Sequence, residues 1–209
     1  MKFKAYIFDF DGTLVNSAPD LANAVNAMRS HYSLSPLDRE TIISYIGNGA
    51  LKLVQRSLNE TEIDCDDALE VFLECYKRDI CNETCFYPDV IKFLDELLAR
   101  EIPAGILTNK PQEMTDILLK KLSADHYFQF AFGPDEFGKK PDPTGLAECL
   151  KILNLKPEEV LMVGDHNTDI FAANALTVPS VYLSYGFGII GDSKPDYVFD
   201  SFEELFRFL

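Results

Sequence analysis

The chain has 209 residues and a formal net charge of −15, with 47% hydrophobic and 25% charged residues. This composition is typical of a globular protein with one sizeable core and room for a small second module. The negative charge argues against nucleic acid or an anionic membrane surface as a partner. No stretch approaches the length of a membrane span, and no signal peptide precedes the first predicted strand, so we expect a cytoplasmic protein.

The first predicted strand covers residues 4–8 and ends in two carboxylates, Asp9 and Asp11, followed by Gly12 and Thr13. A buried strand rarely ends in paired charges, because a desolvated carboxylate is costly unless something compensates it. Asp9 is suited to attack a phosphoryl group and form an aspartyl-phosphate. Asp11 is suited to protonate the leaving oxygen and then to activate the hydrolytic water. A hard cation must accompany this chemistry, and Mg²⁺ is the natural choice for carboxylate ligands near a phosphate.

Residues 16–82 are predicted to form an all-helical insert, because apolar residues recur there at helical spacing. Within the insert, Gly47, Asn48 and Gly49 precede a predicted helix. Free backbone N–H groups in such a loop suit an anion such as a carboxylate, although Gly-Asn-Gly is also ordinary turn chemistry. The apolar positions that define the four helical faces are Leu21, Val25, Met28, Tyr32, Ile42, Ile43, Ile46, Leu51, Leu53, Val54, Leu58, Leu69, Phe72, Leu73 and Tyr76.

Four of the five cysteines lie between Cys65 and Cys85, which raises the question of a zinc site. Their spacings lack the C-x₂-C pattern of a zinc knuckle, so we expect reduced thiols. The three histidines show no spacing typical of a metal site or a catalytic triad.

Beyond residue 87, predicted helices and strands alternate, and this alternation indicates a parallel sheet covered on both faces. Ligands of such sheets bind at the carboxyl ends of the strands. The predicted strands lie at residues 103–108, 130–132, 160–164, 180–183 and 198–199. The predicted helices lie near residues 88–100, 111–122, 143–154, 168–175 and 202–209.

Three further polar groups lie at or near these strand ends. Thr108 and Asn109 follow the second core strand, and the Thr108 hydroxyl could bind a phosphate oxygen. Lys139 and Lys140 precede a Pro-x-Pro segment whose restricted backbone can hold one ammonium in place. Asp165 follows a buried-type strand, and Asp169 would lie in the first turn of the next helix. We therefore expect all of these groups to meet at one edge of the sheet.

In this order, these motifs resemble those of the haloacid dehalogenase superfamily of phosphohydrolases. The resemblance implies a Rossmann-like core formed by residues 1–15 and 83–209, and a helical cap formed by residues 16–82. It favours Lys140 over Lys139, since the family's lysine directly precedes the first proline. It implies that Asp165 binds the metal directly and that Asp169 binds it through water or orients its neighbours. The expected metal ligands are Asp9, Asp11, Asp165 and Asp169, and the expected phosphate-binding residues are Gly12, Thr13, Thr108 and Asn109.

One position departs from the family pattern. The residue after the fourth-motif aspartate is usually a small hydroxyl residue, and here it is His166. We expect the His166 side chain to face solvent rather than to touch metal-bound water.

Three segments resemble the phosphoglycolate phosphatase branch of the superfamily more specifically. Two lie in the insert and one in the core: Asn16–Leu21, Ile46–Ala50 and Leu107–Pro111. The expected function is magnesium-dependent hydrolysis of a small phosphate monoester, 2-phosphoglycolate, by a monomer or homodimer. Gly47, Asn48 and Gly49 would then bind the carboxylate of the substrate. Alternatives are a sugar phosphomutase or another small-molecule phosphatase of the superfamily.

Two other activities fit the sequence less well. Dehalogenases generally lack the second aspartate, here Asp11. A phosphonate hydrolase is expected to need a lysine from the first cap helix, and residues 18–32 contain only Arg29. A non-catalytic relative should have lost a core acid, and none of the expected acids is missing.

Overall fold

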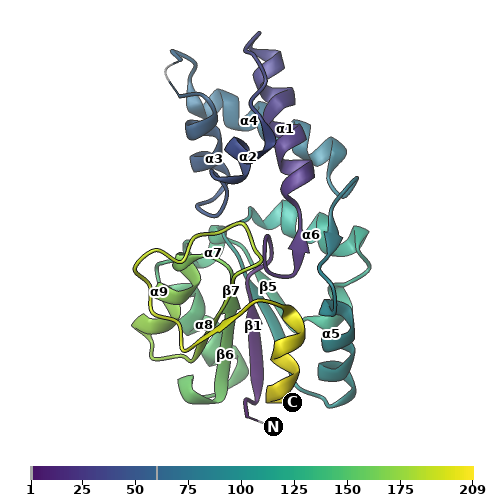
Figure 1. Cartoon of the computed structure of the whole chain (residues 1–209), viewed down its shortest axis with the longest axis vertical. Helices are drawn as coiled ribbons and strands as arrows, with labels where there is room; N and C mark the ends of the chain where they lie inside the picture. Colours follow the sequence, from purple (N-terminus) through teal and green to yellow (C-terminus); the bar gives the residue numbers. More distant parts are fainter. Residues whose placement is uncertain (1, 60) are drawn as a thin grey trace.

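The centre of the protein is a six-stranded parallel sheet, described here from a computed structural model that covers residues 2–59 and 61–209 (Figure 1). Its strand order is β5-β4-β1-β6-β7-β8, and every neighbouring pair is parallel. The strands are β1 (Ala5–Phe8), β4 (Ala104–Leu107), β5 (Phe130–Phe132), β6 (Val160–Gly164), β7 (Ser180–Leu183) and β8 (Tyr197–Phe199). The expected α/β fold with a parallel sheet is confirmed.

Strand β1 shows why the sheet is covered on both faces. All four of its residues are buried, and successive side chains point to opposite faces. Ala5 and Ile7 pack into a smaller apolar cluster with helices α8 (Thr144–Leu153) and α9 (Asn167–Ala175), whereas Tyr6 and Phe8 belong to a larger cluster. The ring of Phe93, from α5 (Val90–Ala99), packs edge-on against the rings of Tyr6 and Phe8. Buried apolar area on both faces therefore holds the strand at the centre of the sheet.

Helices and short 3₁₀ turns connect the strands of the core. The core helices are α5 (Val90–Ala99), α6 (Gln112–Lys121), α7 (Pro134–Phe137), α8 (Thr144–Leu153) and α9 (Asn167–Ala175). The 3₁₀ segments are η1 (Asp125–Tyr127), η2 (Pro157–Glu159) and η3 (Phe202–Phe208). The helix expected at the C-terminal end is thus a 3₁₀ helix, and α7, η1 and η2 are additional short elements that the periodicity did not predict.

Four helices gather beyond one end of the sheet (Figure 1). They are α1 (Ala18–His31), α2 (Arg39–Ile43), α3 (Ala50–Ser57) and α4 (Cys65–Asp79), all within the segment expected to be helical. A small antiparallel ribbon of β2 (Val15–Asn16) and β3 (Cys85–Phe86) joins the chain entering this helical region to the chain leaving it. The ribbon is too short to have a periodic signal, and the sequence did not predict it.

The strand order reverses between β1 and β6, because the chain runs outward from β1 to β4 and β5 and then returns to β6. Open parallel sheets bind ligands in the crevice at such a reversal, outside the carboxyl ends of the strands. Asp9 follows β1 and Asp165 follows β6, so both flank this point. In residues 2–59 and 61–209, every helix is too short or too polar to cross a bilayer.

Candidate active site

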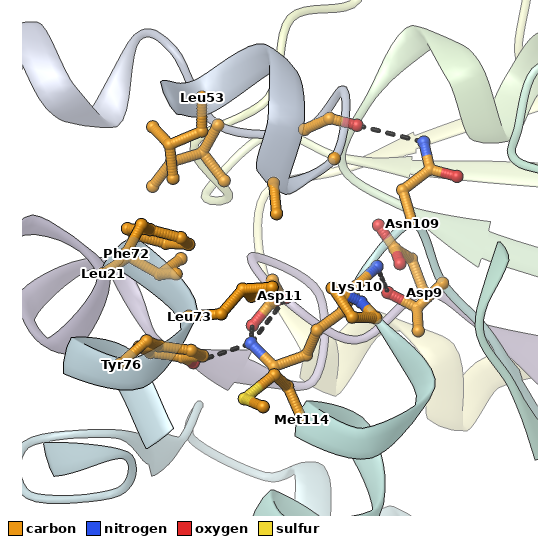
Figure 2. A pocket seen from close by; sticks show the side chains of 16 residues that line it. Asp9, Asp11, Leu21, Leu53, Phe72, Leu73, Tyr76, Asn109, Lys110 and Met114 are labelled. Carbon is orange, nitrogen blue, oxygen red and sulfur yellow. Dashed lines mark hydrogen bonds and ion pairs between the residues drawn. The ribbon is translucent and has the colours of Figure 1, made fainter. Parts of the chain in front are cut away.

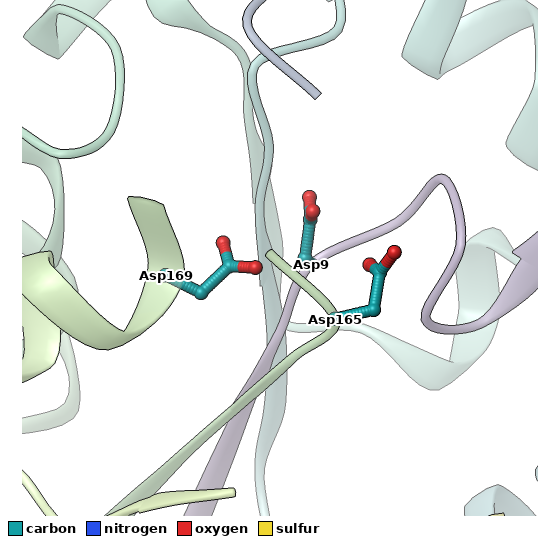
Figure 3. A group of neighbouring side chains, drawn as sticks. All are labelled: Asp9, Asp165 and Asp169. Carbon is teal, nitrogen blue, oxygen red and sulfur yellow. The ribbon is translucent and has the colours of Figure 1, made fainter. Parts of the chain in front are cut away.

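Three buried carboxylates meet where β1, β6 and α9 converge (Figure 3). Each of Asp9, Asp165 and Asp169 offers a carboxylate oxygen, and these oxygens lie within 4.8 Å of one another. Asp169 lies in the first turn of α9, where the helix dipole favours a negative charge. The topology therefore brings together side chains that are 156 to 160 positions apart from Asp9 in the sequence (165 − 9 and 169 − 9).

The acidic cluster carries more negative charge than its surroundings favour. Burial raises the pKa of Asp9 from 3.8 to about 6, although the Lys140 ammonium opposes this rise. Burial, together with repulsion from Asp9 and Asp169, raises the pKa of Asp165 well above its usual value. A set of hard oxygen donors in this state fits Mg²⁺ or a similar divalent cation, which would compensate the charge.

Lys140 is the cation of this centre. Its ammonium lies 2.9 Å from Oδ1 of Asp9 and 2.7 Å from Oδ1 of Asp169, and its side chain is almost fully buried. It also donates to the carbonyl oxygen of Leu107 at the end of β4. Burial alone would lower the pKa of Lys140, but the two carboxylates raise it above its usual value, so the side chain stays charged. The neighbouring Lys139 is exposed.

The turn after β1 and a second loop fix the position of Asp165. Thr13 donates its hydroxyl to Oδ1 of Asp165 at 2.8 Å, and the backbone N–H of Gly188 donates to Oδ2 at 2.9 Å. Gly188 lies in the glycine-containing loop of residues 186–191, for which the sequence showed no function. The glycines of this loop are the sequence feature that could have indicated its role. They let the loop approach Asp165 closely, since a Cβ on Gly186 would lie 2.2 Å from the Asp165 side chain.

Asp11, expected from the sequence to be a metal ligand, lies outside the three-carboxylate cluster. Its carboxylate accepts hydrogen bonds from Ser17 Oγ and from Lys110 Nζ, the latter at 3.1 and 3.2 Å. Lys110 also donates to the hydroxyl of Tyr76 at 2.6 Å. Burial lowers the pKa of Lys110, and Asp11 and Tyr76 outweigh this effect, so the net shift is upward. Lys110 is not among the site residues expected from the sequence.

Thr108 and Asn109 lie at the end of β4, beside the acidic cluster, and both are buried. Nδ2 of Asn109 donates to the carbonyl oxygens of Lys140, at 3.0 Å, and of Gly47, at 3.2 Å. Asn109 therefore connects the lysine loop of the core with the glycine loop of the helical region. Its Oδ1 atom is buried, has no hydrogen-bond donor among the described residues and remains available as an acceptor.

A cavity lies between the core and the four helices (Figure 2). Asp9, Asp11 and Thr108 line its core side, and Gly47 and Gly49 line its opposite side. Asn48 is turned away into the helical region, where its Oδ1 accepts from Arg56 at 2.8 Å. The two glycines thus border the same cavity as Asp9 and Asp11, while the side chain of Asn48 binds Arg56 within the helical region.

The expectation that His166 faces solvent is wrong, because the side chain is only 5% exposed. Its Nδ1 accepts from the backbone N–H of Thr168 and so caps α9, and burial lowers its pKa. The other edge of the ring lies against Gly47: a Cβ on that glycine would lie 2.5 Å from Cδ2 of His166. The position of His166 between a strand and a helix could have indicated a helix cap. The sequence has no signal for its contact with Gly47, which lies 119 positions away (166 − 47).

Comparison with known proteins extends this description. Residues 6–183 match the family described as haloacid dehalogenase-like hydrolase. The chain is 39% identical to a phosphoglycolate phosphatase from Colwellia psychrerythraea, over 95% of this chain and 93% of the relative. It is 36% identical to a phosphoglycolate phosphatase from Chromobacterium violaceum, over 97% and 95% of the two chains.

A solved structure is also similar to this chain over nearly its whole length. The crystal structure of a predicted phosphoglycolate phosphatase from Haemophilus somnus superimposes with a TM-score of 0.93 at 33% identity, covering 99% of this chain and 98% of that one. In this shared fold, Asp9 and Asp165 directly follow β1 and β6. Asp169, in the first turn of α9, and Lys140, in the segment between α7 and α8, lie against them. The chain belongs to the haloacid dehalogenase-like hydrolase family.

Proposed function

We propose that this hydrolase removes the phosphoryl group from 2-phosphoglycolate in a magnesium-dependent reaction that passes through an aspartyl-phosphate on Asp9. The observation that carries the proposal is the meeting of Asp9, which lines the cavity, with Asp165, Asp169 and Lys140. The choice of substrate rests on the relatives, since proteins 34–39% identical to this chain are named phosphoglycolate phosphatases.

In the first step, a carboxylate oxygen of Asp9 attacks phosphorus and the ester bond breaks. Asp11 donates a proton to the departing glycolate oxygen. Lys140 and the Thr108 hydroxyl bind phosphoryl oxygens and stabilise the charge that develops on them. The backbone N–H of Phe10, which donates to Oδ1 of Asp9 at 2.7 Å, holds the nucleophile in place.

In the second step, Asp11 takes a proton from water, and this water attacks phosphorus of the aspartyl-phosphate. The Asp9–phosphorus bond breaks, which restores the Asp9 carboxylate and releases inorganic phosphate. Asp9, Asp165 and Asp169 would hold Mg²⁺, which supplies positive charge beside the phosphate dianion. Residues 16–82 would act as a cap that keeps bulk water away from the acyl-phosphate.

Gly47 and Gly49 would form the substrate wall opposite Asp9. Helix α3 begins at Ala50 without a side-chain cap, so the N–H groups of its first turn remain available to an anion. These groups and the cavity face of Gly49 are the features of the cap that would distinguish a phosphorylated acid from other phosphate esters.

A panel of phosphate monoesters, assayed with Mg²⁺ and with excess chelator, tests the proposal. We expect 2-phosphoglycolate to give the highest kcat/KM, and chelation to abolish turnover until Mg²⁺ is restored. Full activity in chelator would contradict the metal assignment. Transfer of the phosphoryl group to a sugar phosphate, instead of release of inorganic phosphate, would identify a mutase.

A further inference from the structure

The cavity that holds the reacting groups is mainly apolar on its cap side. Leu21, Phe72 and Leu73 face Asp11 and Lys110 across it (Figure 2). These side chains offer no hydrogen-bond donors, and a carboxylate placed against them would lose its hydration without compensation. Among the described residues that line the cavity, Lys110 is the only cation. Lys110 is therefore the charged group of this lining that can compensate a second negative charge on a substrate, beside the uncharged N–H groups at the start of α3.

Lys110 lies where such a second charge would arrive. Its ammonium is 3.1 Å from Oδ1 of Asp11, the group that protonates the ester oxygen in the proposed reaction. In a 2-phospho-hydroxy acid, a single carbon separates the ester oxygen from the carboxylate. A carboxylate on that carbon is therefore within hydrogen-bonding reach of an ammonium that already contacts Asp11.

Tyr76 holds the ammonium on the cap side. Its hydroxyl lies 2.6 Å from Nζ of Lys110, and Nζ lies 4.5 Å from the centre of the Tyr76 ring. Tyr76 belongs to α4, whereas Lys110 belongs to the core segment between β4 and α6. Both side chains are buried, so the ammonium has little freedom to rotate away from the cavity. A fixed charge of this kind selects its ligand more sharply than a mobile one.

We propose that Lys110 is a specificity-determining residue that binds the carboxylate of the substrate, and that Tyr76 of the cap orients it. This inference rests on the proposed function and identifies Lys110 as the positive charge that recognises the acid group of the substrate. In the free protein, the ammonium is shared between Asp11 and Tyr76. With substrate bound, the carboxylate becomes an additional acceptor, and an ester without a carboxylate gains nothing from the lysine.

The test compares 2-phosphoglycolate with 2-phosphoglycolamide, in which a neutral amide replaces the carboxylate at nearly the same volume. The variants are Lys110→Met, which removes the charge, and Lys110→Arg, which keeps it. We expect Lys110→Met to lower kcat/KM for the acid at least about tenfold more than for the amide, mainly through KM, because a charge-assisted hydrogen bond is lost. Lys110→Arg should restore part of the preference for the acid.

A role limited to positioning Asp11 would give a different pattern. Both esters would then lose activity by the same factor, mainly in kcat, and this result would overturn the proposal. If Lys110→Met does not fold, Tyr76→Phe provides the test, because it leaves the lysine and its partner Asp11 in place. We expect this variant to lower the acid-to-amide ratio of kcat/KM at least about threefold, and an unchanged ratio would overturn the proposal.

The unaltered enzyme separates this inference from the function on which it rests. Hydrolysis of the amide without hydrolysis of the acid would overturn the role of Lys110 and leave the phosphatase chemistry standing. Hydrolysis of neither ester, in the presence of Mg²⁺, would overturn both.

Discussion

Gly12 shows how closely the two catalytic strand ends approach each other. Its φ of +86° lies in the region that favours glycine, and a Cβ at this position would lie 2.2 Å from Oδ2 of Asp165. From the sequence, Gly12 is expected among the phosphate-binding residues. The structure adds a further reason for the glycine, which is that any side chain at position 12 would displace the carboxylate expected to bind the metal.

We predict that Gly12→Ala weakens Mg²⁺ binding more than it weakens the fold. The new methyl group must push Asp165 away from its hydrogen bond with Thr13, which disturbs the ligand set directly. The apparent Kd for Mg²⁺, measured by activation of turnover or by calorimetry, should rise by about tenfold or more. An unchanged Mg²⁺ affinity would show that Asp165 does not bind the metal.

At the scale of elements, the N-terminus of α9 links the core to the cap. His166 caps the helix through Nδ1, and Asp169 completes the capping box by accepting from the backbone N–H of His166 at 3.0 Å. The outer edge of the imidazole lies against Gly47. One residue thus stabilises the helix that carries Asp169 and supports the loop that borders the cavity.

Two substitutions separate these two roles. His166→Ala should lower the free energy of unfolding by about 1 kcal/mol through loss of the cap, whereas His166→Asn, which retains a capping oxygen, should lower it by less. Both variants remove the ring from Gly47, so both should raise KM for 2-phosphoglycolate. Denaturant melts and steady-state kinetics check the two effects, and an unaltered KM in both variants would show that the Gly47 contact has no role in substrate binding.

The elements that the sequence predicts well are those whose signal is local. Strand β1 is a buried apolar run, and α3 has a clear apolar face after Gly49, so their type and position follow from periodicity. The acidic cluster was also predictable, because parallel strands bring their carboxyl ends to one edge. Asp9, Asp165 and Asp169 therefore appear together in the prediction and in the structure.

The features that the sequence did not predict depend on contacts between distant segments. Pairing of β2 with β3 joins residues about 70 positions apart (85 − 16 = 69), and neither strand is long enough to show alternation. The burial of His166 depends on Gly47, and the environment of Lys110 depends on Tyr76. A single sequence carries no signal for such pairs, because each residue by itself has an ordinary local role.

At the scale of the whole molecule, the cap and the core are connected at a narrow joint. The carboxylate of Asp20, at the start of α1, accepts from the backbone N–H groups of Glu83 and Thr84 and from the Thr84 hydroxyl. This buried carboxylate ties the outgoing chain to the returning chain beside the β2–β3 ribbon. The joint fixes where the cap begins, and the cavity lies between the cap and the carboxyl edge of the sheet.

The acidic cluster couples the stability of the molecule to pH and to metal. Asp9 has a pKa of about 6 in the folded chain and an ordinary value near 3.8, so the folded state binds this proton more tightly than the unfolded state. Between these two values, the metal-free protein should lose stability as pH rises, and above about 6 the full penalty should be present. A divalent cation that binds the ionised cluster removes this penalty.

We therefore predict that Mg²⁺ stabilises the protein more at pH 7.5 than at pH 5. At a Mg²⁺ concentration of about 100 times Kd, the expected gain is about 2.7 kcal/mol, which corresponds to a rise in Tm of roughly 5 to 10 °C for a chain of this size. Thermal melts with chelator and with Mg²⁺ at the two pH values measure the effect. An equal or larger gain at pH 5 would contradict metal binding by the ionised carboxylates.

The central claim is that Asp9 forms the covalent intermediate, and the turnover of Asp9→Asn tests it most directly. An amide cannot form the acyl-phosphate, so kcat for 2-phosphoglycolate with saturating Mg²⁺ should fall by about a thousandfold or more in a folded, contamination-free preparation. A cooperative thermal transition in the variant would show that the loss is chemical. Retention of more than about a few per cent of kcat in the folded variant would contradict the mechanism.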